Sequence, residues 1–178
     1  LGGKRKMNIT GKRIAILVAD DFEDIELTEP REELAVAGAE TFIIGMEAGT
    51  VAKGKHGTTV EVEQAAGEVS EFDFDLLLIP GGQAPEKLRL DEGVLDLVRR
   101  MDDAGKPIAA ICHAPLVLVS AGRVQGRRMT AYRGVREDVA NAGAEVVDEP
   151  VVVDGNIITS RGPEDIPQFV EAVVEILQ

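Results

Sequence analysis

The chain has 178 residues, of which 44% are hydrophobic and 29% charged, and its formal net charge is −13. This length accommodates one domain with a sizeable core, and no apolar run approaches the roughly 18 to 20 residues that a membrane span needs. The negative charge argues against nucleic acid as a partner, because phosphates would be repelled, and a single cysteine excludes an internal disulfide and favours a reducing cytoplasm.

The N-terminal residues 1–12 are interpreted as a tail. The stretch "LGGKRK" before Met7 lacks the apolar region of a signal peptide. We interpret it as partly vector-derived, with Met7 as the native start. Residues 13–178 are expected to form a single α/β domain.

Short apolar runs alternate with helical patterns along this domain. Buried strands are predicted at 13–20, 41–46, 74–82 and 107–112, and helices at 31–40, 91–106, 114–122 and from Pro163 to the C-terminus. The alternation continues through 127–132 and 136–143, 151–160 has a hairpin pattern around Asp154-Gly155, and 49–70 is irregular, with an exposed strand at 56–63. This order predicts a flavodoxin-like, doubly wound and mostly parallel sheet sandwiched by helices.

Ligands of such sheets bind beyond the carboxyl ends of the strands. Three stretches follow predicted strands directly: "ADDFEDIE", "PGGQAPE" and "CHAP". We therefore expect these stretches to converge at one edge of the sheet.

Cys112, the only cysteine, stands where a predicted strand turns into a helix. Such a corner pushes its side chain outward, and the positions two before and two after must be small; here they are Ala110 and Ala114. The alternative is a small buried hydrophobe. The context favours a nucleophile elbow with a reactive thiolate, whose pKa the following helix N-terminus would hold below the ~8.5 of a free thiol.

Chemistry at a carbonyl also needs donors for a developing oxyanion. The backbone N–H of His113 is one candidate, and the "PGG" turn at 80–82 can supply another. Adjacent side chains at a helix start usually diverge, which argues against direct contact between His113 and Cys112. Two interpretations of the His113 imidazole remain: it receives a proton during catalysis, or it is a polar side chain at the mouth of the pocket without a catalytic role. His56 is interpreted as structural, and no metal site is expected because no zinc-ligand spacing is present.

Several carboxylates follow the first strand, and each alone is weak evidence of function. An acid held against a thiolate would be pushed toward its protonated form and could donate a hydrogen bond to sulfur. A solvated loop is the simpler interpretation for any one of Asp20, Asp21, Glu23, Asp24 or Glu26.

These motifs, with "GKHG", "AY" and "VVVDGNIITSRGPED", resemble the PfpI family, the intracellular protease-like and deglycase branch of the DJ superfamily, which shares its core with class I glutamine amidotransferases. The resemblance runs from about Arg13 to the C-terminus. It implies no cofactor, and homodimers or larger homo-oligomers with active sites at the interface. The implied site residues are Cys112 as nucleophile, His113 as its imidazole, Glu23 as the acid touching the thiol, Gly82 and His113 as oxyanion donors, Glu86 reaching the site of an adjacent subunit, and Tyr132 and Arg161 lining the pocket.

Two departures from the family pattern lie near the site. Ala114 stands where relatives often carry glycine, although it still meets the size requirement of the elbow. Arg133-Gly134 stands where relatives often have Pro-Gly, so the wall of the pocket departs there from the family pattern.

The family does not fix the reaction. The first hypothesis is a stress-protective cysteine hydrolase that acts on a small aldehyde, a glycated protein or a peptide. The second is a redox-sensing or chaperone-like protein whose Cys112 is oxidised without turnover.

Overall fold

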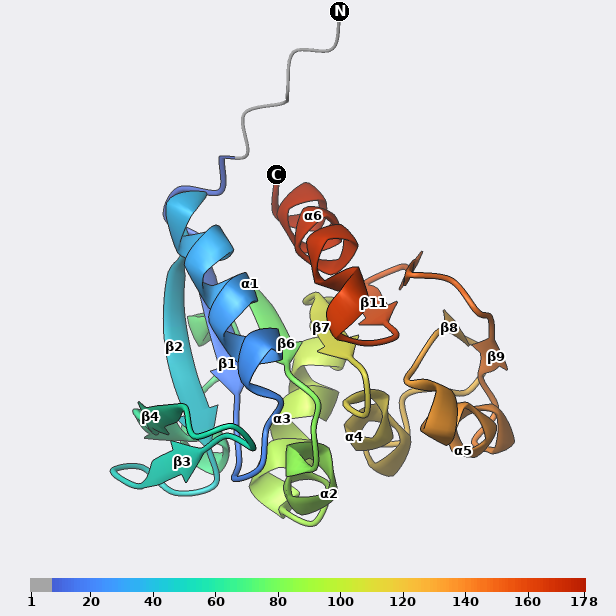
Figure 1. The fold of residues 1–178 in the computed structure, drawn as a ribbon, viewed down its shortest axis with the longest axis horizontal. Coiled ribbons are helices and arrows are strands. Elements are labelled where there is room, and N and C mark those ends of the chain that lie inside the picture. Colours follow the sequence, from blue (N-terminus) through green and yellow to red (C-terminus); the bar gives the residue numbers. More distant parts are fainter. Residues whose placement is uncertain (1–7) are drawn as a thin grey trace, which may run out of the picture.

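The computed structural model of the protein describes residues 8–178 and has a parallel sheet at its centre (Figure 1). The sheet contains seven strands among these residues, in the order β10-β11-β7-β6-β1-β2-β5. Every pairing in it is parallel except that of β10 with β11. The sheet strands are β1 (Arg13–Leu17), β2 (Glu40–Gly45), β5 (Gln64–Ala65), β6 (Leu76–Ile79), β7 (Ile108–Ile111), β10 (Val151–Asp154) and β11 (Ile157–Ser160).

Helices cover both faces of this sheet. The step from β1 to β2 and the step from β6 to β7 run in opposite directions across it, so right-handed crossovers place α1 and α3 on opposite faces. Helix α6 packs beside α1 (Figure 1). The helices are α1 (Asp24–Val36), α2 (Ala84–Leu88), α3 (Glu92–Asp103), α4 (Pro115–Ser120), α5 (Arg136–Asn141) and α6 (Ile166–Leu177). The predicted doubly wound α/β architecture is confirmed.

Two small sheets lie outside the central one. Strands β3 (Val51–Lys53) and β4 (Thr59–Glu61) form an antiparallel pair, which confirms the exposed strand expected within 56–63. Strands β8 (Arg128–Met129) and β9 (Glu145–Val146) pair with each other, so the run 127–132 does not join the central sheet. The predicted hairpin is β10–β11 with its turn at Asp154-Gly155.

Helix α1 begins at Asp24, seven residues before the predicted start. The sequence pattern placed the boundary after Pro30, because proline removes a backbone donor inside a helix. In the structure Pro30 is buried within the helix, and Leu27 and Leu34 on the same side are fully buried. Packing on the sheet therefore outweighs the cost of the proline. As a result, part of the acidic stretch after β1 forms the first turn of α1.

Residues 1–7 of the predicted tail, including Met7, lie outside the described residues. Ile9, from the rest of that tail, is only 2% exposed, and its N–H donates to the Ala37 carbonyl at 2.9 Å. No helix among residues 8–178 combines the length and apolarity needed to cross a bilayer.

Candidate active site

Cys112 stands at the sharp turn between β7 and α4, with a φ of 66°. Positive φ is costly for a residue with a side chain. Two hydrogen bonds hold it: the Cys112 N–H donates to the Ser160 carbonyl at 2.9 Å, and its carbonyl accepts from the Tyr132 N–H at 2.9 Å. Ala110 and Ala114 are fully buried where strand and helix approach. The turn has the geometry of the predicted nucleophile elbow.

Two backbone N–H groups interact with the Cys112 sulfur, those of Gly82 and His113. Gly82 has a φ of 79°, and a Cβ there would lie 2.5 Å from the Asp21 carbonyl oxygen. Glycine is therefore required for the β6 end to approach the segment after β1. At Gly81, a Cβ would lie 2.7 Å from the Cys112 Cβ. The predicted convergence of the three strand ends is thus seen in their contacts.

The acid against the thiol is Glu26, which is fully buried and interacts with Cys112 by a hydrogen bond. Its Oε1 accepts from the Gly81 N–H at 2.8 Å. Its Oε2 is buried and has no hydrogen-bond partner within the described part of the chain. The arrangement seats the carboxyl group between the turn after β6 and the sulfur.

The expectation that Glu23 touches the thiol is wrong, because its carboxylate turns to the loop between β3 and β4. Its Oε2 lies 3.5 Å from Lys55 Nζ, and its Oε1 lies 3.4 Å from His56 Nε2. Glu23 precedes α1, whereas Glu26 lies one turn inside it on the buried side. A sequence signal existed: the spacing 26, 30, 34 places Glu26 on the same helical stripe as Pro30 and Leu34.

Burial raises the pKa of Glu26 to about 7. Burial, together with the charge of the Glu26 carboxylate, also raises the pKa of the Cys112 thiol to about 12, while the N–H groups of Gly82 and His113 oppose the rise. The predicted lowering of this pKa is contradicted, because burial and the Glu26 carboxylate outweigh the two N–H groups. Below about pH 7 both the thiol and the carboxyl group are protonated, and above it the pair keeps one proton, on sulfur. Protonation of Glu26 removes the repulsion, and loss of the thiol proton then leaves a thiolate facing two N–H donors.

His113 contacts the Cys112 sulfur directly, contrary to the expected divergence of adjacent side chains. Its Nδ1 lies 3.2 Å from the Cys112 sulfur, and its ring stacks on Tyr132 with centroids 4.6 Å apart. Burial lowers the pKa of His113, so the imidazole is neutral at neutral pH and can accept a proton. Glu86 is exposed on α2, and its charge opposes this lowering from within the same chain.

Arg161 does not contact the cysteine. Its guanidinium pairs with Asp165 at 2.8 Å and with Asp148 at 3.0 Å, and it lines a pocket together with Tyr132. Within residues 8–178, no three His, Cys, Asp or Glu side chains are grouped so that they could hold a metal ion.

The sequence profile of the DJ-1/PfpI family matches residues 12–176. The chain belongs to the DJ-1/PfpI family. Among curated relatives, this DJ-1/PfpI chain is 45% identical to a deglycase of Pyrococcus abyssi and 44% identical to the deglycase PfpI of Pyrococcus furiosus, each over 93% of this chain and 99% of the relative. It is 43% identical to protein/nucleic acid deglycase 2 of Escherichia coli, over 93% of this chain and 98% of that protein.

The structure agrees with this family. Drosophila melanogaster DJ-1beta is similar with a TM-score of 0.87 and 30% identity, over 93% of this chain and 90% of the fly protein. The DJ-1/PfpI membership predicted from the motifs is confirmed. Glu26 and Gly81 are the site residues that the motif comparison missed.

Proposed function

We propose that the protein is a PfpI-type deglycase, a cysteine-dependent hydrolase that acts on glycated or aldehyde-modified substrates. The observation that carries the proposal is the strained Cys112, whose sulfur lies 3.2 Å from His113 Nδ1 and beside the buried Glu26. Three curated relatives that cover nearly this whole chain are named deglycases, which supports the substrate class.

The chemistry begins with attack of the Cys112 sulfur on an aldehyde-type carbon. A carbon–sulfur bond forms, the carbonyl electron pair moves to oxygen, and the thiol proton passes to His113 Nδ1. The N–H groups of Gly82 and His113 stabilise the oxyanion of the hemithioacetal that results. Protonated Glu26 donates to sulfur and stabilises the negative charge that develops there as the proton leaves for His113.

Peptides are a second substrate class consistent with this nucleophile, and a cytoplasmic location fits the free thiol. We also propose a homo-oligomer in which Glu86 orients His113. The exposed position of Glu86 on α2 leaves it available to a neighbouring chain, while its charge already acts on His113 of its own chain.

The deglycase proposal is tested with a substrate panel: a methylglyoxal hemithioacetal, a glycated amino acid and a peptide. The wild type should turn over at least one of the first two. Cys112→Ala should lower that rate by at least about a thousandfold, because the nucleophile is lost. Since Cys112 is the only cysteine, the variant has no other thiol to substitute.

Two results would overturn the deglycase proposal. One is equal turnover by wild type and Cys112→Ala. The other is stoichiometric oxidation of Cys112, measured by intact mass, without turnover of any substrate; that result would establish the redox-sensing alternative.

The role of Glu86 is tested by mixing subunits. Cys112→Ala and Glu86→Ala chains, each with low activity alone, are combined under conditions where subunit exchange is demonstrated by mass. If Glu86 acts across an interface, mixed dimers regain up to about half of the wild-type activity per dimer, because one site has both residues.

The result of that mixing also decides the opposite case. No recovery despite exchange assigns Glu86 to the site of its own chain. Full activity of Glu86→Ala alone removes it from the machinery altogether.

A further inference from the structure

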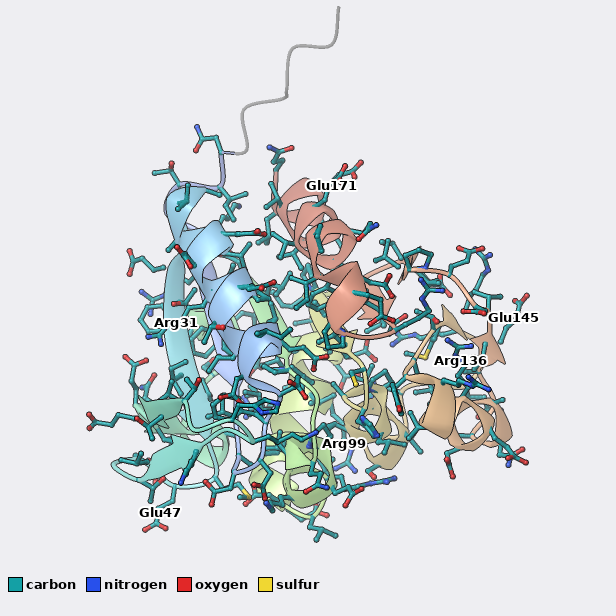
Figure 2. All side chains as sticks on the ribbon, in the orientation of Figure 1. Arg31, Glu47, Arg99, Arg136, Glu145 and Glu171 are labelled. Carbon is teal, nitrogen blue, oxygen red and sulfur yellow. The ribbon has the colours of Figure 1, made fainter. Side chains whose placement is uncertain are left out.

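A pocket of about 440 Å³ is lined in part by Tyr132, whose ring stacks on His113. Its lining residues come from α5 and from the segments after β8, β9 and β11: Tyr132, Arg133, Arg136, Asp148, Arg161 and Glu164. Figure 2 shows Arg136 at the edge of the molecule formed by α5, β8 and β9.

Two of these arginines are already neutralised. Arg161 makes a bidentate pair with the buried Asp165, through Nε at 2.8 Å and Nη2 at 3.0 Å. Asp148 bridges Arg161 and Arg136 at 3.0 and 3.1 Å. Arg136 is further fixed by a hydrogen bond from its Nε to the Ala131 carbonyl at 3.0 Å. These pairs hold the wall of the pocket and leave little charge for a ligand.

Arg133 differs from both. Its guanidinium makes no ion pair or hydrogen bond with any residue in the described range 8–178, and its side chain is exposed at the pocket. The other unpaired charge is Glu164, which is also exposed. Arg133 follows Tyr132 directly, and the Tyr132 ring stacks on His113, whose Nδ1 touches the sulfur. A free planar cation with five donors therefore lies one residue from the ring that stacks on the catalytic imidazole.

We propose that this pocket is a substrate subsite in which Arg133 binds an anionic group, a carboxylate or a phosphate, carried by the molecule whose aldehyde-derived carbon reacts with Cys112. Guanidinium groups bind both anions in bidentate fashion. The subsite deepens the proposed function and rests on it: the preferred substrates are glycated or thiol-adduct molecules that bear a negative charge near the reacting carbon.

The kinetic test uses two methylglyoxal hemithioacetals that differ in one group. The adduct of N-acetylcysteine carries a carboxylate, and the adduct of N-acetylcysteamine lacks it. The ratio of kcat/KM for the charged over the neutral adduct should fall about fivefold in Arg133→Gln, as expected for an exposed ion pair. Arg133→Lys should restore part of the ratio.

The matched control is Arg31→Gln, which changes the net charge equally. Arg31 lies on α1, on the opposite side of the molecule from α5 (Figure 2). This control should keep the wild-type ratio. An unchanged ratio in Arg133→Gln, or an equal fall in Arg31→Gln, overturns the proposal.

A binding test separates the subsite from the reaction. The chain has one tyrosine and no tryptophan, so its intrinsic fluorescence reports on Tyr132 alone. Titration of the wild type with N-acetylglycine or inorganic phosphate should change this emission, whereas the neutral N-acetylglycinamide should not. The effective anion identifies carboxylate or phosphate as the preferred group.

The outcomes of the two tests are distinguishable. If neither adduct is turned over but the anion response is present in the wild type and lost in Arg133→Gln, the deglycase proposal fails and the anion subsite stands. If both adducts are turned over and Arg133→Gln responds to anions like the wild type, the subsite fails and the deglycase proposal stands. No response to either anion in the wild type also overturns the subsite.

Discussion

Between pH 4.5 and 7 the free energy of unfolding of the wild type is expected to fall by about 3 kcal/mol relative to that of Glu26→Gln. Burial raises the pKa of this carboxyl from its ordinary value of 4.5 to about 7 in the folded protein. Between these values the folded state holds a proton that the unfolded state has released. The contribution to the free energy of unfolding is therefore fully present below pH 4.5 and is lost as pH rises through 7.

Urea unfolding of wild type and Glu26→Gln from pH 4 to pH 8 measures this difference. The wild-type curve should descend relative to that of Glu26→Gln across the window and run parallel to it above pH 7.5. Glu23→Gln changes the net charge equally and separates that general effect from the buried carboxyl. Parallel curves for wild type and Glu26→Gln through the whole range would contradict a proton held at Glu26.

Replacing Gly82 by alanine is expected to cost about 3 kcal/mol of stability and at least about a hundredfold in kcat. A Cβ at this position would lie 2.5 Å from both the Asp21 carbonyl oxygen and the Glu23 nitrogen, and the φ of 79° is itself unfavourable for alanine. The backbone must shift to relieve the overlap, and the Gly82 N–H then moves away from the sulfur. Loss of one such donor costs about 10²- to 10³-fold in comparable sites.

Gly126→Ala provides the matched control, because Gly126 has a φ of 75° and nothing within 4 Å of its Cβ position. This variant should lose only about 1 kcal/mol, from the backbone conformation alone, and should keep its activity. Chemical denaturation and steady-state kinetics on both variants measure the two effects. Equal losses in Gly82→Ala and Gly126→Ala would mean that the close approach at Gly82 contributes nothing.

The nucleophile elbow was predictable from local sequence. Ala110 and Ala114 leave room where β7 and α4 approach, and Cys112 stands between them at a positive φ. Hydrophobic patterning also determined the order of buried strands and covering helices, because strand and helix periods are properties of short windows. The strand ends meet for the same reason, since parallel neighbours finish at one edge of a sheet.

Which acid touches the sulfur was decided only by tertiary structure. Both Glu23 and Glu26 belong to one short acidic stretch, and Pro30 concealed the early start of α1. Packing on the sheet turned Glu26 inward against Gly81 and left Glu23 to Lys55. The pKa of Cys112 followed from the same packing, because burial and a neighbouring carboxylate outweigh the N–H groups of Gly82 and His113. The sequence by itself determined the fold and the place of Cys112 at the turn from strand to helix; the electrostatics around that residue depend on distances between segments far apart in the chain, which only the folded structure sets.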